Sequence, residues 1–140
     1  MARRALSNAK LVSVTELFRG YHDATASSPF RNDQEVLCHG DLGLHNTVFR
    51  GDTAVAIIDW DADLAPGCRI EDSAHAVWCF ADLIEASVPV YEQARRAQLM
   101  CAAYPGMTPS AVLTELRARS TRARHHRAPD RPAAVEVFEG

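Results

Sequence analysis

A hairpin signal between residues 46 and 60 limits the folds that this chain of 140 residues can adopt. The segments "NTVFR" and "TAVAIIDW" are rich in β-branched and aromatic residues, and Gly51 and Asp52 stand between them. Two such runs around a Gly-Asp pair predict antiparallel strands joined by a tight turn. Because helical signals dominate the rest of the chain, we expect only a small sheet.

Four other segments are expected to be helices, over residues 5–26, 71–86, 90–104 and 108–124. In the first, apolar residues recur at three- and four-residue steps, and the last starts at a Thr-Pro-Ser signal. The segment "DADLAPGCR" (61–69) is expected to be a loop. The predicted fold class is therefore α+β, mainly α, with helices around one β-hairpin.

Composition and length indicate one ordinary globular domain. A hydrophobic fraction of 47% and a charged fraction of 24% are typical of soluble proteins. Residues 1–124 are expected to form the domain, and the polar, proline-rich residues 125–140 a flexible tail. No apolar run approaches the roughly 20 residues that a membrane-spanning helix needs, and no signal peptide is visible. The four cysteines form no C-x-x-C pair, so we expect reduced thiols in a cytoplasmic protein.

The predicted hairpin also brings polar side chains together. With its turn at residues 51–52, residue 46 faces about residue 57, so Asn46 and Asp59 converge at the open end, with Asp41 in the loop before them. An amide oxygen and carboxylates are hard ligands of the kind that Mg²⁺ favours, completed by water and substrate phosphates. A further carboxylate near the metal suits a general base that orients a hydroxyl nucleophile.

The same residues carry a family resemblance. "HGDLGLHN" (39–46) followed by "IIDWD" (57–61) resembles the H-x-D-x-x-x-x-N and I-D-W segments of the aminoglycoside phosphotransferase and choline kinase-like family. These are small-molecule kinases related in fold to protein kinases, and the resemblance spans roughly residues 5–104. It implies the C-terminal lobe of the kinase-like fold.

The resemblance also implies a role for each matching residue. Asp41 would be the catalytic base, and Asn46 and Asp59 would hold Mg²⁺. His39 and Asp72 would give structural support to the catalytic loop. The implied cofactors are Mg²⁺ and ATP or GTP, whose γ-phosphate passes to the hydroxyl of a small-molecule acceptor. The nucleotide-binding residues and the acceptor itself do not follow from the motifs.

The chain departs from the family pattern before the catalytic loop. Only about 36 residues precede it, no glycine-rich motif is present, and the only lysine is Lys10. We therefore expect the family's N-terminal β lobe, with its clamp on the phosphates, to be absent from this chain, and activity of the chain alone to be weak or absent. The alternative function is a truncated, non-catalytic remnant that binds a partner or forms a homodimer through the face that the missing lobe would cover.

Two further interpretations have less support. His22, His45 and His75 could join Asp41 and Asp59 in the transition-metal site of a phosphohydrolase, but no H-x-x-x-H pair supports it. The basic segment "RARSTRARHHR" (117–127) could contact nucleic-acid phosphates. Without interleaved aromatic residues, and in a chain of net charge −3, it is expected to be a solvated helix end, so nucleic acid is not an expected partner.

Four aromatic residues at or near helical spacing could either belong to the core or line an acceptor pocket. The core is the expected place, because aromatic side chains in such patterns are most often buried. These residues are Trp78, Phe80, Tyr91 and Tyr104.

Overall fold

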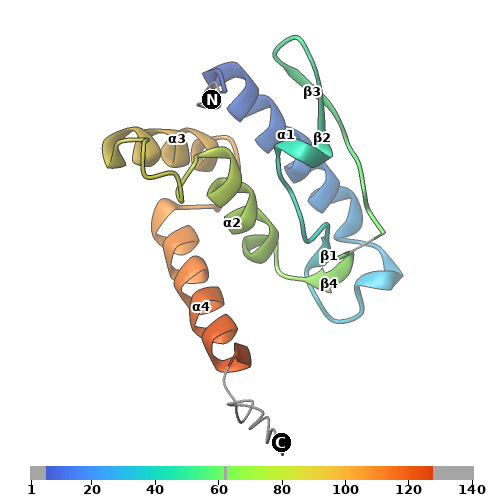
Figure 1. Ribbon diagram of the computed structural model, residues 1–140. Coiled ribbons are helices and arrows are strands. Elements are labelled where there is room, and N and C mark those ends of the chain that lie inside the picture. Colours follow the sequence, from blue (N-terminus) through green and yellow to red (C-terminus); the bar gives the residue numbers. More distant parts are fainter. Residues whose placement is uncertain (1–5, 62, 128–140) are drawn as a thin grey trace, which may run out of the picture.

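The computed structural model describes residues 6–61 and 63–127, with side chains up to residue 122, and has a mainly helical α+β fold (Figure 1). The helices and small antiparallel sheets confirm the predicted class, which is α+β and mainly α. The elements in chain order are α1 (Asn8–Thr25), a 3-10 turn η1 (Pro29–Arg31), β1 (Val36–Cys38), a 3-10 turn η2 (Leu44–Asn46), β2 (Thr47–Arg50), β3 (Thr53–Ile57), β4 (Ala65–Gly67), α2 (Arg69–Phe80), α3 (Val90–Ala102) and α4 (Pro109–Arg127).

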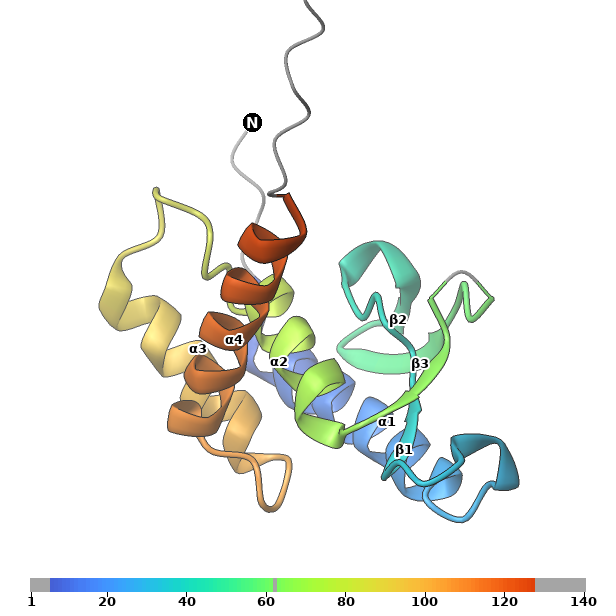
Figure 2. The same cartoon turned by 90° about the horizontal axis from the view of Figure 1, so that it is seen from below.

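Helix α1 begins after the N-cap residue Ser7, whose hydroxyl accepts a hydrogen bond from the Lys10 N–H (3.2 Å). Its apolar stripe buries Leu11 and Phe18 completely. This is the helix predicted over 5–26. It contacts both the hairpin and α3, so it connects the two sides of the molecule (Figures 1 and 2).

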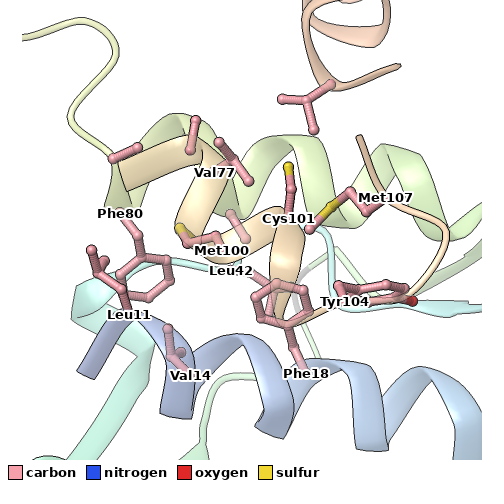
Figure 3. Close-up of a cluster of buried hydrophobic side chains, with 14 of the residues drawn as sticks. Leu11, Val14, Phe18, Leu42, Val77, Phe80, Met100, Cys101, Tyr104 and Met107 are labelled. Atoms are coloured by element: carbon pink, nitrogen blue, oxygen red, sulfur yellow. The ribbon is translucent and has the colours of Figure 1, made fainter. Parts of the chain in front are cut away.

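The hydrophobic core lies between α1 and the other three helices (Figure 3). Phe18 of α1, Phe80 of α2, Met100 of α3 and Val112 of α4 are all at most 1% exposed. Burying a large apolar side chain stabilises a fold by roughly 1.5–3 kcal/mol. The core therefore holds the four helices together, and the loops are anchored on them.

The hairpin forms as predicted, with β2 and β3 antiparallel and the turn at Gly51 and Asp52. It packs on α1, where the Ser13 hydroxyl accepts a hydrogen bond from the Ala54 N–H (2.8 Å). In Figure 2 the hairpin and the pair α3–α4 lie on opposite sides of α2. The site described below lies on the side of the hairpin that faces α2.

The predicted register of the hairpin is wrong by one residue, because β3 carries a β-bulge. The prediction placed residue 57 opposite Asn46, whereas the Ile58 N–H donates to the Asn46 carbonyl (2.8 Å). Pairing near the turn is as predicted, so the extra residue lies within the strand. Because of the bulge, Ile58 lies opposite Asn46, and Asp59 is the next residue after it.

The segment predicted as a loop over 61–69 contains a strand, β4, which pairs antiparallel with β1 and places Ala65 opposite Cys38. The strand is only three residues long and includes Pro66, so it carries no alternating pattern that a sequence could show. Its pairing with β1 fixes the chain directly before residues 39–46.

Helix α2 is shorter than the predicted helix over 71–86, since it ends at Phe80. Asp82 takes a φ of 55°, in the left-handed region that a helix cannot continue through. The predicted helix over 90–104 is confirmed as α3. The predicted helix over 108–124 is confirmed as α4, which continues for three more residues to residue 127.

A flexible tail is predicted over 125–140, but residues 125–127 form the end of α4. Residues 128–140 lie outside the described part of the chain. None of the helices in the described ranges is long and apolar enough to cross a membrane.

Candidate active site

The loop that joins β1 to β2, residues 39–46, carries three of the predicted site residues and is called the catalytic loop below. Gly40 takes a φ of 89°, in the left-handed region that favours glycine. A Cβ at this position would lie 2.6 Å from both the Cβ and the carbonyl oxygen of Asp63. Only glycine therefore allows the segment after the hairpin to pass this close to the catalytic loop.

Asp72, on the first turn of α2, is 2% exposed and lies directly behind the backbone of the catalytic loop. Its Oδ2 accepts a hydrogen bond from the His39 N–H (2.9 Å), and its Oδ1 accepts one from the Gly40 N–H (3.0 Å). Hydrogen bonds to an ionised acceptor are about twice as strong as neutral ones. One side chain of α2 thus fixes two successive peptide groups just before Asp41.

A buried chain of hydrogen bonds reaches Asp72 from α1. His22 is fully buried, donates from Nε2 to Asp72 Oδ2 (2.7 Å) and accepts at Nδ1 from the Tyr104 hydroxyl (2.8 Å). Arg69 donates to the same hydroxyl (3.1 Å), which leaves the hydroxyl proton for His22. Burial alone would raise the pKa of Asp72, but hydrogen bonds from His22 and the two loop amides outweigh it and hold the pKa below its usual value.

His39 joins the catalytic loop to the end of the hairpin and is fully buried. Its Nε2 donates to the Ile58 carbonyl (2.8 Å), and its Nδ1 accepts from the Asp41 N–H (3.1 Å). Both partners are backbone groups, so they assign the ring to its neutral Nε2–H tautomer. The ring packs edge-on against Trp60 with 4.5 Å between ring centroids. Both ring nitrogens are therefore engaged in holding the loop.

Asp41, the predicted base, has a side chain that is 39% exposed and can be reached from solvent. Asn46 Nδ2 donates to its backbone carbonyl (3.0 Å) and to its Oδ2 (3.2 Å). His45 Nε2 also lies 2.9 Å from Oδ2, and His75 Nε2 of α2 lies 3.4 Å from Oδ1. The hydrogen bond from His45 outweighs partial burial and, with a smaller effect from His75, holds the pKa of Asp41 below its usual value.

Asn46 and Asp59, the predicted metal ligands, lie at the open end of the hairpin. The Asn46 Nδ2 is committed to Asp41, so the amide oxygen Oδ1 is directed elsewhere. Asp59 is exposed and takes a φ of 63°, uncommon for a residue other than glycine. An amide oxygen and a carboxylate are hard oxygen donors, and Mg²⁺ completes its shell with water and phosphate oxygens. The donor set therefore fits Mg²⁺.

The structure separates His22 from the other two histidines of the transition-metal interpretation. His22 is bonded to Asp72 and Tyr104, whereas His45 and His75 both contact Asp41. Within the described ranges, no group of three or more His, Cys, Asp or Glu side chains is arranged to hold a metal ion.

Two cavities near the catalytic loop have His75 and Arg119 in common in their linings. One has a volume of about 330 Å³ and is also lined by Gly40, Glu71 and Glu115. The other, of about 310 Å³, is lined by Trp78, Leu116 and Ser120 as well.

The expectation that the four aromatic residues belong to the core is half right. Phe80 and Tyr104 are buried, but Trp78 is 37% exposed at a cavity and Tyr91 is 76% exposed.

Sequence reasoning placed His45 and His75 near Asp41 only in the transition-metal interpretation, and it did not connect Arg119 with the site. His45 directly precedes Asn46, and His75 follows Asp72 by three residues on α2, so both stand next to predicted site residues in the sequence. Arg119 lies 44 residues beyond His75, and no local pattern connects the two. Only the packing of α4 on α2 brings them into contact.

The loop and the hairpin place an aspartate and an asparagine five residues apart and a second aspartate after the hairpin, as in the phosphotransferase motifs that the sequence resembles. The phosphotransferase enzyme family matches residues 2–135, so the chain belongs to this family, as its resemblance implied. At the family level it is a phosphotransferase-type enzyme. No curated protein and no solved structure matches the chain significantly.

Proposed function

We propose that this chain is the C-terminal lobe of a kinase-like small-molecule phosphotransferase, which moves the γ-phosphate of ATP or GTP to a hydroxyl with Mg²⁺. The observation that carries the proposal is the pair of hydrogen bonds from Asn46 Nδ2 to the carbonyl (3.0 Å) and carboxylate (3.2 Å) of Asp41. They tie a base candidate to a metal-ligand candidate on one loop, beside the hairpin end that carries Asp59. Membership of the phosphotransferase enzyme family supports the same reaction class.

Asp41 is suited to orient the acceptor hydroxyl and to take its proton. Its lowered pKa keeps it ionised at neutral pH, and its exposed carboxylate has lone pairs beyond those used by its neighbours. A carboxylate with a low pKa is a weak base, which suits a reaction whose barrier depends mostly on positioning and on charge stabilisation. The proton would pass from the hydroxyl to a carboxylate oxygen of Asp41 as the phosphoryl group is transferred.

Asn46 Oδ1 and the Asp59 carboxylate would hold Mg²⁺. When bound, the ion would neutralise charge on the nucleotide phosphates and orient them for in-line transfer. The contribution of this chain is to keep the two ligands fixed relative to Asp41, through the amide hydrogen bonds of Asn46 and the pairing of the hairpin strands.

Isothermal titration of the chain with ATP and with GTP, each with and without Mg²⁺, tests this function. We expect nucleotide binding that requires Mg²⁺, that is lost in Asp59→Ala and that persists in Asp33→Ala, a control at an exposed loop position. Nucleotide binding of equal strength without Mg²⁺, or in Asp59→Ala, would contradict the proposed metal site. Absence of binding under every condition would contradict nucleotide-dependent activity of this chain by itself.

A second candidate function is association with another copy of this chain. It is favoured by three exposed apolar side chains of the hairpin and its exit, Val48, Val55 and Ile58, which are 42%, 43% and 47% exposed. Clustered exposed apolar residues are typical of interaction surfaces. Sedimentation velocity over a range of protein concentrations tests this candidate.

A further inference from the structure

A line of three side chains connects helix α4 to the base candidate of the catalytic loop. Arg119 Nη1 lies 3.0 Å from His75 Nδ1, and His75 Nε2 lies 3.4 Å from Asp41 Oδ1. The three residues come from α4, α2 and the catalytic loop, so the contact exists only in the folded chain. We propose that His75 is a positioning residue for Asp41, and that Arg119 sets the tautomer in which His75 does this.

The partners of His75 determine which ring nitrogen carries the proton. A guanidinium has donors and no acceptor, so His75 Nδ1 must accept the hydrogen bond from Arg119. A neutral imidazole then carries its proton on Nε2, the nitrogen that faces Asp41. A doubly protonated ring would place two donors against each other at Nδ1. Burial and the charge of Arg119 also lower the pKa of His75, although the contact with Asp41 opposes them.

The two oxygens of the Asp41 carboxylate have different partners. Oδ2 contacts both Asn46 Nδ2 (3.2 Å) and His45 Nε2 (2.9 Å), whereas the contact of Oδ1 is with His75. The terminal torsion of an aspartate side chain is broad, so one well-held oxygen does not fix the plane of the group. A donor at Oδ1 restricts the plane and aims the second lone pair of that oxygen. At 3.4 Å the Nε2–Oδ1 contact is longer than a normal hydrogen bond, and catalytic hydrogen bonds often shorten only when substrate binds.

His75 is also placed where an acceptor would contact it. Its side chain is 19% exposed, and together with Arg119 it forms the wall that the two cavities share. An alternative role for Arg119 and His75 is simply to pack α4 on α2. The two roles differ in what a conservative change at His75 should do, because packing needs a ring-sized group and positioning needs a donor at Nε2.

This inference rests on the proposed function for its catalytic consequence, but the contacts of His75 themselves can be tested without activity. Long-range ¹H–¹⁵N correlation NMR of the full chain should show His75 as the neutral Nε2–H tautomer at neutral pH. Asp41→Asn should shift the Nε2–H resonance, whereas the exposed control Asp33→Asn should leave it unchanged. A ring protonated on Nδ1, or a resonance unaffected by Asp41→Asn, would overturn the proposal whether or not the chain transfers phosphate.

The second measurement follows phosphate release from Mg·ATP, with water as the acceptor. We expect His75→Leu to lower kcat about tenfold, the effect of losing one hydrogen bond in the transition state, while KM for Mg·ATP stays near the wild-type value. His75→Gln should recover most of the rate, because its amide nitrogen lies the same number of bonds from Cα as the ring Nε2. His75→Gln as slow as His75→Leu, or His75→Leu as fast as wild type, would contradict a positioning role.

Arg119 provides a separate test that leaves His75 in place. Arg119→Leu should lower kcat less than His75→Leu does, and should allow His75 to become doubly protonated in NMR spectra at a higher pH than in the wild type. The charged and titratable groups that act on this ring are Asp41, Arg119, Asp72 and Cys79. Arg117→Leu is the matched control on the same exposed stretch of α4, and it should change neither quantity. Equal behaviour of the two arginine variants would overturn the role of Arg119.

If wild type releases no phosphate while the NMR results are as expected, the proposed function fails and the Asp41–His75–Arg119 contact stands. If phosphate is released but the NMR results are not as expected, the proposed function stands and the proposed role of the Asp41–His75–Arg119 contact fails.

Discussion

The Asp72 carboxylate accepts hydrogen bonds from His22 and from two peptide groups of the catalytic loop while it is only 2% exposed. In Asp72→Asn the amide group would oppose at least one of these donors with a donor of its own. We expect the free energy of unfolding to fall by about 2–4 kcal/mol at neutral pH, the usual effect of breaking a buried, charge-assisted network. Urea denaturation monitored by circular dichroism measures the change, with Asp33→Asn as the exposed control.

The same residue predicts how this difference depends on pH. The folded-state pKa of Asp72 is lowered relative to an unfolded value of about 3.9, so its stabilising effect is fully present above about pH 4. The effect is lost as the pH falls through the folded-state pKa, because Asp72 then becomes protonated in the folded protein as well. The stability of wild type should thus approach that of Asp72→Asn in acid. A difference that grew on acidification would contradict this sign.

At the scale of secondary-structure elements, α3 is held to the turn after α2 by one buried arginine. Arg96 is 6% exposed, donates to Asp82 Oδ2 (2.8 Å) and also contacts Glu92 Oε1 (3.1 Å). Arg96→Gln leaves the two carboxylates without this cation, and we expect a loss of about 2 kcal/mol in the free energy of unfolding. Chemical denaturation measures it.

The neighbouring Arg95 is a matched control for this prediction. It contacts the same Glu92 and also Asn8, but its side chain is 46% exposed. Ion pairs in solvent contribute little, because water and salt screen them. Arg95→Gln should therefore destabilise the protein far less than Arg96→Gln, and equal effects would mean that burial of the pair does not matter.

Elements with local signals could be predicted from the sequence, and pairings over distance could not. The hairpin and α1 follow from residue type and period. The bulge in β3 could not be foreseen, because "TAVAI" has no Gly or other feature that marks an extra residue. Strand β4 exists through its partner β1, and its own three residues carry no alternation.

The candidate site shows the same division. Asp41, Asn46 and Asp59 stand in recognisable motifs, so they could be named in advance. The position of His75 beside Asp41 and that of His22 behind Asp72 depend on how α1 and α2 pack against the loop, whereas His45 contacts Asp41 from within the loop. A histidine on a helix surface has the same sequence pattern whether it ends up packed, solvated or bonded to a catalytic residue. The core of four helices decides between these outcomes.

At the scale of the whole molecule, the side of the hairpin turned away from α1 is the surface to test for association. Ala54 of β3 is buried toward α1, but other apolar residues of β3 and of the segment that follows it are exposed. Among them Val55 is 43% exposed and Ile58 is 47% exposed. If this surface joins two copies of the chain, the sedimentation coefficient should rise with protein concentration toward that of a dimer.

A charge placed in this surface should then prevent association, because it would be buried without a partner at the interface. Val55→Lys should sediment as a monomer at concentrations where wild type is dimeric. Val90→Lys introduces the same change at a residue of α3 that is 79% exposed and lies away from the hairpin, and it should associate like wild type. Wild type that stays monomeric throughout, or equal behaviour of the two lysine variants, would exclude the hairpin as a dimer surface and leave phosphotransfer as the function to pursue.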